Sequence, residues 1–177
     1  CKENIFVYLE LLVNFIFEYA LAKLLTRLGI TPYAMIGYSF GEYVAACLAG
    51  VFSLEDGIKL VIARGKLMSK TLPAVMLSVP LPENEIKPLL KDHAGVSLAI
   101  INGSSCVVAG EQKSIETFES QMREKRLLCV PVNMAHGVHS PLMKPIREEL
   151  EKKVKVIKMG NPRIPYISNV SGTWITV

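Results

Sequence analysis

The chain has 177 residues; half are hydrophobic, a fifth are charged, and the formal net charge is +4. This composition excludes a disordered chain, and the mild charge suits acidic ligands but lacks the clustered basic stripe of a nucleic-acid-binding protein. The cysteines are widely scattered and form no closely spaced pair, which predicts small buried side chains in a reducing cytoplasm, without disulfides or a metal site. They are Cys1, Cys47, Cys106 and Cys129.

The first predicted element is a helix over residues 5–28 that ends at Gly29. Its apolar stretch "IFVYLELLVNFIF" is interrupted by Glu10 and Asn14, so it is too short for a membrane span, and it lacks the basic start of a signal peptide. We therefore expect a buried helix. Because the chain has no initiator methionine and stops in a strand-like segment, we expect it to be a fragment of a longer protein.

A strand, a turn and a helix follow, in an order typical of α/β proteins. Residues 33–37 predict a short buried strand, and residues 40–49 predict a helix that ends near Gly50. Ser53 and Asp56 form a capping pair that starts the next helix.

The middle of the chain changes character and predicts the order β-α-β-β-α-β, typical of a ferredoxin-like unit. The expected elements are strands over residues 74–80, 96–102, 105–110 and 126–132, and helices over 83–90 and 112–125. A loop with a helix and a final strand complete the chain. The sequence thus predicts an α/β fold in which a large domain, residues 1–74 and 134–177, is interrupted by a small lobe, residues 75–133.

Ser39 lies in the stretch "GYSFG", between the predicted strand and helix. A G-x-S-x-G pattern in this context is typical of a nucleophile elbow, a sharp turn that exposes a reactive serine. The backbone N–H of Phe40 would then face the oxyanion that forms when Ser39 attacks a carbonyl group. The alternative is an ordinary turn in which Ser39 only caps the helix.

Arg64 lies on the apolar face of its predicted helix. Its neighbours three and four positions away are Leu60, Val61, Leu67 and Met68. A buried guanidinium group is unfavourable without a partner anion, so Arg64 is a candidate ligand-binding residue. A structural ion pair, or extension of the side chain to the surface, remains open at this point.

His139 precedes a predicted helix start, with Ser140 as N-cap and Pro141 in the first turn. A helix N-terminus disfavours the imidazolium ion, and a neutral ring is what a general base needs. His136 lies in the same loop, and an ordinary hydrogen-bonded loop residue is the alternative for either histidine. Asp92 would complete the chain order of a hydrolase triad but lies in a polar turn, so a Ser–His dyad is favoured.

Several blocks of the sequence resemble one family in the same order. "AMIGYSFGEYVAACLAGVFSLEDGIKLVIARGKLM", "AIINGSSCVVAG", "HGVHSPLM" and "PYISNVSGTWIT" are similar to segments of the acyltransferase domains of polyketide synthases and of malonyl-CoA:acyl carrier protein transacylases. The resemblance covers roughly residues 17–177. It implies an α/β-hydrolase-like core that carries a ferredoxin-like small subdomain, incomplete here at both ends, because the segment with an oxyanion-hole glutamine and a C-terminal portion have no counterpart.

The resemblance also implies roles for individual residues. Ser39 matches the acylated serine, His139 the general base, and Phe40 the residue whose backbone N–H serves the oxyanion hole. Arg64 matches the arginine that holds the free carboxylate of a malonyl-type unit, and Met68 a residue that lines the acyl pocket. The implied reaction moves this unit from CoA to the phosphopantetheine thiol of an acyl carrier protein in the cytoplasm. The resemblance implies no bound cofactor or metal and no binding to nucleic acid or a membrane. Other domains of a megasynthase are implied partners.

Substrate preference can be predicted from two positions. The segment "HGVH", which begins at the substrate-binding candidate His136, is closer to the form found in malonyl users than to that of methylmalonyl users, and Phe40 also resembles the malonyl set. Malonyl-CoA is therefore the expected substrate, with methylmalonyl-CoA as the alternative. Tyr38 departs from the family's usual histidine, and Gly137 and Val138 are smaller than the usual pair.

Two other functions share part of this pattern. A serine esterase or thioesterase would use the same turn around Ser39, but it does not explain Arg64 or the inserted lobe. A non-catalytic acyltransferase remnant that only docks a carrier protein would not need Ser39, His139 and Arg64 to be intact.

Overall fold

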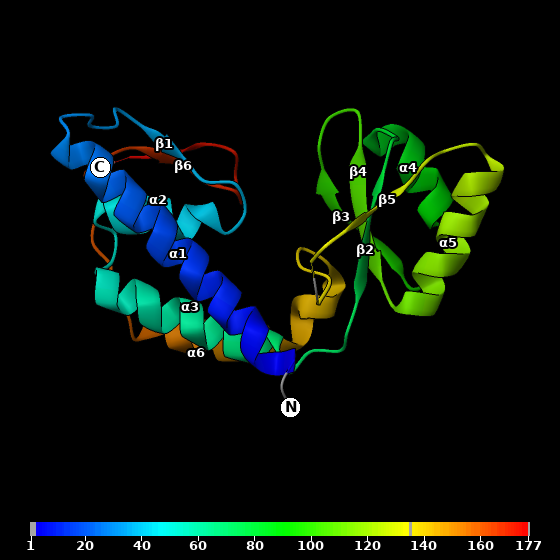
Figure 1. Ribbon diagram of the computed structural model, residues 1–177, viewed down its shortest axis with the longest axis horizontal. Helices are drawn as coiled ribbons and strands as arrows, with labels where there is room; N and C mark the ends of the chain where they lie inside the picture. The colour runs from blue at the N-terminus through cyan, green and yellow to red at the C-terminus, as the bar shows by residue number, and fades with distance from the viewer. Residues whose placement is uncertain (1–2, 135, 177) are drawn as a thin grey trace. The chain divides into compact units, whose positions relative to one another are not determined.

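The computed structural model describes residues 3–134 and 136–176, and the side chains from residue 8 onward; Cys1 lies outside the described residues. The chain has a mixed α/β fold that divides into two compact units. Unit 1 comprises Cys1–Ser69 and Glu148–Val177, and unit 2 comprises Lys70–Arg147. Figure 1 shows the elements of each.

Unit 1 combines a small sheet with helices. In the sheet, β1 pairs with β6 in parallel, and β6 pairs with β7 in antiparallel. The helices are α1 (Glu3–Arg27), α2 (Gly41–Ala49), α3 (Leu54–Met68) and α6 (Arg147–Lys155), and the strands are β1 (Met35–Ile36), β6 (Tyr166–Ile167) and β7 (Trp174–Ile175).

Close contact between α1 and α3 builds much of unit 1. A Cβ atom on Gly57 would lie 2.7 Å from the Phe15 ring, and one on Gly65 would overlap with Tyr8, so these two glycines let the helices approach. Phe15 is fully buried, and the small side chains of α2 pack into the same core. These contacts fix the start of α2, where the candidate nucleophile lies.

Unit 2 is an antiparallel sheet covered by helices. Its strand order is β3-β4-β2-β5. The elements are β2 (Val75–Val79), α4 (Glu83–Leu90), β3 (Val96–Ile101), β4 (Cys106–Gly110), α5 (Gln112–Glu124), β5 (Val130–Val132) and a 3-10 helix η1 (Pro141–Ile146). Figure 1 shows α4 and α5 on the same side of the sheet, and Ile86, Phe118 and Met122 from these helices pack against Leu77 and Val108 of the strands.

Most predicted helices and strands are confirmed. The order β-α-β-β-α-β is observed for β2 to β5, and α2 ends at Gly50, whose φ of 84° is left-handed. Ser53 caps α3, because its Oγ accepts a hydrogen bond from the Asp56 N–H at 3.0 Å. The short strand β1 is also present, but its predicted burial is wrong for Ile36, which is 76% exposed.

Unit 2 has wider boundaries than the small lobe predicted over residues 75–133. Residues 70–74 and 134–147 belong to unit 2. Contacts between these flanking segments explain the difference: Thr71 Oγ1 lies 3.1 Å from His136 Nδ1, and a Cβ on Gly137 would lie 3.0 Å from Ala74 Cβ. Such contacts join residues far apart in the sequence and leave no local pattern.

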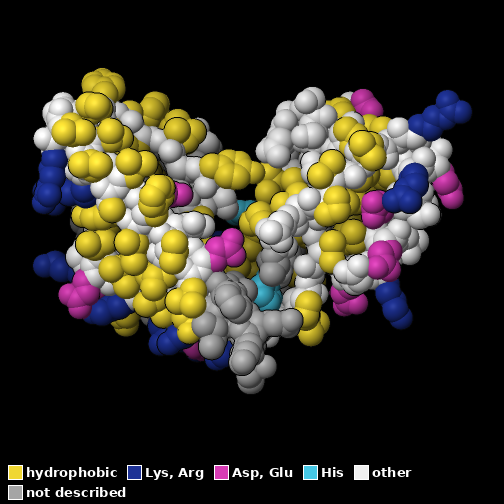
Figure 2. Space-filling view, viewed as in Figure 1, with side chains coloured by type: hydrophobic (Ala, Val, Ile, Leu, Met, Phe, Trp, Pro, Cys, Tyr) yellow, Lys and Arg dark blue, Asp and Glu magenta, His cyan; other side chains and the backbone are white. Residues whose placement is uncertain are grey.

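The expectation of a buried first helix is wrong for part of α1. One side packs on α2 and α3, whereas Val13, Phe17 and Leu24 are each more than half exposed. Figure 2 shows hydrophobic side chains gathered over α1 on this face. Apolar residues surround the helix, so a single packed side cannot bury them all. Within the described residues, no helix is long and apolar enough to cross a membrane.

Candidate active site

Ser39 lies at a sharp turn between β1 and α2, as the sequence predicts. Its φ is +50°, a left-handed conformation that residues with a side chain rarely adopt. Gly37 makes the turn possible, because a Cβ there would overlap with the backbone of Gly41 and Glu42. Gly41 has more space: the nearest atom to a Cβ on this residue is Glu18 Oε2, at 3.8 Å.

The backbone N–H groups after Ser39 differ in their partners. The Gly41 N–H donates to the Tyr38 carbonyl at 2.9 Å, and the Glu42 N–H donates to the Ser39 carbonyl at 3.3 Å. Both donors are therefore engaged within the turn. The Phe40 N–H has no acceptor within the part of the chain that the structure describes, so it is the donor available to a developing oxyanion.

Arg64 lies on the apolar face of α3, as predicted, but it is only half-buried. Its neighbours Leu60, Val61 and Met68 are buried. The guanidinium carbon lies 5.7 Å from the centre of the Phe40 ring and 5.1 Å from that of Tyr43, so two aromatic rings of the turn and of α2 hold the cation.

The structure bears differently on the two structural roles left open for Arg64: its partial exposure agrees with extension of the side chain to the surface, whereas no structural ion pair is described. No described carboxylate forms a salt bridge with Arg64, although salt bridges are present on α3 itself and on α4, α5 and α6. The Phe40 and Tyr43 rings that contact the guanidinium group stack on each other, with their centres 5.5 Å apart. Phe40 directly follows Ser39, so a ring beside Arg64 belongs to the turn that carries the candidate nucleophile.

The two candidate histidines lie in unit 2, in a loop with an unusual backbone. His136 has a φ of 72° and His139 one of 62°, and Gly137 between them has 55°. His136 is buried, and its Nδ1 lies within hydrogen-bond distance of Thr71 Oγ1. His139 is exposed.

The predicted helix start after His139 is confirmed in part. Ser140 caps the following turns, because its Oγ accepts a hydrogen bond from the Leu142 N–H at 3.3 Å and donates one to the Gly137 carbonyl. Those turns form the 3-10 helix η1, however, and the α-helix begins only at Arg147. Pro145 explains this, because it lacks the N–H that an α-helix would use.

The sites thus divide between the units. Ser39, Phe40, Arg64 and Met68 belong to unit 1, and His136 and His139 belong to unit 2.

Within the described residues, no group of three or more histidine, cysteine or acidic side chains could hold a metal ion. Cys47, Cys106 and Cys129 are buried free thiols, and burial raises the pKa of each.

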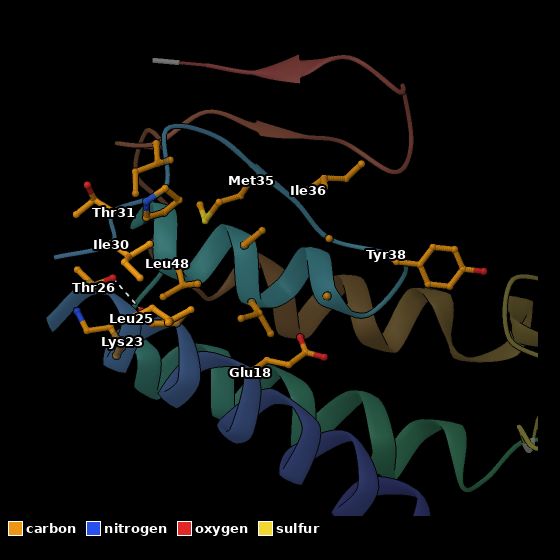
Figure 3. Close-up of a pocket in the computed structure, with 17 residues that line it drawn as sticks. Glu18, Lys23, Leu25, Thr26, Ile30, Thr31, Met35, Ile36, Tyr38 and Leu48 are labelled. Atoms are coloured by element: carbon orange, nitrogen blue, oxygen red, sulfur yellow. Dashed lines mark hydrogen bonds between the residues drawn. The ribbon is translucent and has the colours of Figure 1, made fainter. Parts of the chain in front are cut away.

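A pocket of about 680 Å³ lies beside the turn in unit 1. Leu25 of α1 and Leu48 of α2 line it, and Figure 3 shows the Tyr38 side chain extending away from the remaining residues. Gly37 and Gly41 line it, but Ser39 and Arg64 do not.

Sequence reasoning missed three residues that surround Ser39. Tyr43, three positions after Phe40, shares its helix face, so spacing could have identified it. Glu42 and Asn169 hold the turn through side-chain hydrogen bonds. Nothing local to Asn169 indicates this role, because its partners lie about 130 positions earlier in the chain.

Comparisons with known proteins identify the family. The family model "Acyl transferase domain" matches residues 7–174. A phenolphthiocerol/phthiocerol polyketide synthase of Mycobacterium tuberculosis is 35% identical over 162 residues, which cover 92% of this chain and 11% of that protein. Mycoketide-CoA synthase of the same species is 40% identical over 161 residues, 89% of this chain and 4% of that protein.

Solved structures agree with this match. The acyl transferase domain of ZmaA has a TM-score of 0.87 and 48% identity, over 96% of this chain and 39% of that one. A malonyl CoA-acyl carrier protein transacylase from Burkholderia pseudomallei has a TM-score of 0.84 and 27% identity, over 93% of this chain and 59% of that one. The chain therefore spans a small part of the curated relatives and less than two thirds of these structures. It belongs to the acyl transferase domain family, whose matched members include domains of polyketide synthases.

Proposed function

We propose that the protein moves a malonyl-type unit from CoA to the phosphopantetheine thiol of an acyl carrier protein. Ser39 Oγ attacks the thioester carbonyl while His139 takes the hydroxyl proton. The Phe40 N–H donates to the oxyanion, the C–S bond breaks, and CoA leaves with the proton from His139. The carrier thiol then attacks the Ser39 ester, with His139 as base again, and restores the serine.

The environment of Arg64 is the observation that carries this proposal. A guanidinium group held by Phe40 and Tyr43, with no described carboxylate as its partner, suits the free carboxylate of a malonyl unit. Such a pair forms two parallel hydrogen bonds and selects against acyl groups without a carboxylate. A simple esterase has no need for this cation beside its nucleophile.

Other features support the finer assignment. The βαββαβ order and strand order of unit 2 favour a ferredoxin-like subdomain, and β1, the turn and α2 favour an α/β-hydrolase-like core in unit 1. Phe40 and the "HGVH" segment at His136 favour malonyl-CoA over methylmalonyl-CoA, and Met68 would line the acyl pocket. One matched structure is titled a malonyl CoA-acyl carrier protein transacylase, and the curated relatives are polyketide synthases, which supports a carrier protein and neighbouring synthase domains as cytoplasmic partners.

Intact-mass spectrometry tests the proposal. The protein is incubated separately with malonyl-CoA, methylmalonyl-CoA and acetyl-CoA. We expect a malonyl adduct that Ser39→Ala abolishes, and we expect Arg64→Ala to lower the preference for malonyl over acetyl by about 10- to 100-fold. Lys59→Ala is the matched control, because this exposed lysine on the same helix pairs with Glu55.

Two results would overturn the proposal. No adduct with any CoA ester, in a folded protein, would leave the carrier-docking alternative. Release of the adduct to water as fast as to a carrier thiol would favour a thioesterase.

A further inference from the structure

One side chain from the far end of the chain holds the turn that carries Ser39. Asn169 Nδ2 donates to the Gly37 carbonyl at 2.9 Å and to the Ser39 carbonyl at 3.3 Å. The same nitrogen also donates to Glu42 Oε2 at 2.7 Å, so one of its two N–H groups is shared between two acceptors. The Asn169 backbone N–H donates to the same Glu42 oxygen at 3.2 Å. Asn169 therefore contacts the residues before, at and after the turn.

The sheet explains why residues so distant in sequence meet. β1 and β6 are parallel neighbours, so their carboxyl ends lie at the same edge. β1 leads into the Ser39 turn, and Asn169 is the second residue after β6. The turn after β6, which carries Asn169, is held by a hydrogen bond of its own. Ser168 Oγ accepts this bond from the Val170 N–H at 3.1 Å.

The backbone at Ser39 needs such support. A φ of +50° is unfavourable for a serine, and a strained conformation persists only where its surroundings hold it. The amide of Asn169 joins the carbonyl groups on both sides of Tyr38, and the negative charge of Glu42 strengthens the hydrogen bonds that it accepts. Aspartate cannot replace this amide, because a carboxylate has no N–H to donate.

We propose that Asn169 is a positioning residue that holds Ser39 in its reactive conformation, with Glu42 as its anchor. It acts through the backbone of the turn and not on the substrate. Loss of the amide therefore slows acylation of Ser39 and leaves the choice of acyl group, which belongs to Arg64, unchanged. This inference rests on the proposed role of Ser39 as the nucleophile.

The test compares Asn169→Ala and Asn169→Asp with the matched control Ser171→Ala. Ser171 lies in the same turn, but its hydroxyl pairs with Thr173. Single-turnover acylation by malonyl-CoA and by acetyl-CoA is measured together with labelling of Ser39 by a fluorophosphonate, which needs no acyl-CoA recognition. We expect both Asn169 variants to lower all three rates by about 10- to 100-fold, with KM and the malonyl preference unchanged. The control keeps the rates of the original protein.

Several results would refute the positioning role. A folded Asn169→Asp variant with unchanged rates would do so, and so would a variant that changes KM alone. If neither Asn169 variant folds, Glu42→Gln decides, because it keeps an acceptor oxygen but removes the charge; it must lower the fluorophosphonate rate. If malonyl-CoA fails to acylate the original protein while the fluorophosphonate labels Ser39, the proposed function fails, and the comparison of Asn169 variants still stands.

Discussion

Replacement of Gly37 by alanine tests whether the turn depends on a missing side chain. The added Cβ would lie 2.2 Å from the Glu42 nitrogen and 2.2 Å from the Gly41 carbonyl carbon, where ordinary contacts are 3.4–4 Å. Backbone atoms must then move by more than 1 Å, at the start of a helix that Asn169 also holds. We expect a loss of about 3 kcal/mol in the free energy of unfolding, the upper end for overpacking, and a Tm lower by about 6–12 °C.

Gly41→Ala is the matched control in the same motif. Its Cβ would meet only Glu18 Oε2 at 3.8 Å, and Gly41 is the first residue of α2. Alanine there should stabilise the protein by about 0.5–1 kcal/mol, because it restricts the unfolded chain. Thermal unfolding followed by circular dichroism compares the two variants. Equal Tm values for Gly37→Ala and the original protein, or an equal loss in both variants, would refute the steric argument.

Three further outcomes follow from contacts in unit 1. Ser53→Ala should lower stability by about 1 kcal/mol in urea unfolding, because the Asp56 N–H loses its cap; an unchanged midpoint would contradict the capping role. Tyr43→Leu should weaken the malonyl preference by about 0.5–2 kcal/mol in competition assays, whereas Tyr43→Phe, which keeps the ring beside Arg64, should not. Burial raises the pKa of Cys47 from 9.0 to about 11, so the unfolded chain ionises first and stability falls as the pH rises from 9 to 11. In the Cys47→Ala variant, Tm should therefore fall less between pH 9 and pH 11 than in the original protein. Equal falls in Tm in the two proteins would contradict this role of Cys47.

Local signals predicted the helix ends well. Gly29, Gly50 and Ser53 each act through their own backbone or the next turn, so the sequence contains the relevant information. The division at 75–133 differs from the observed one because contacts such as Thr71 with His136 join segments that are far apart. Burial of Ile36 could not be predicted either, since exposure depends on what packs against a strand and not on its composition.

The residues of the candidate site also differ in whether a local sequence signal points to them. Ser39 and Arg64 could be chosen as candidates because each stands out locally: one is a serine between two glycines, and the other is a charge on an apolar helix face. Asn169 does not stand out in the turn after β6, where asparagine is common. Its contacts with Gly37 and Glu42 follow from the parallel pairing of β1 and β6, which no short pattern encodes.

The left-handed backbone at Ser39, His136 and His139 has a consequence for stability. Glycine adopts these φ values without strain, so glycine at any of the three would relieve about 1–2 kcal/mol of unfavourable conformation. A glycine variant at any of these positions would therefore gain stability while it loses a side chain that the proposed site uses. Arg126, with a φ of 59°, has the same kind of backbone outside the candidate site.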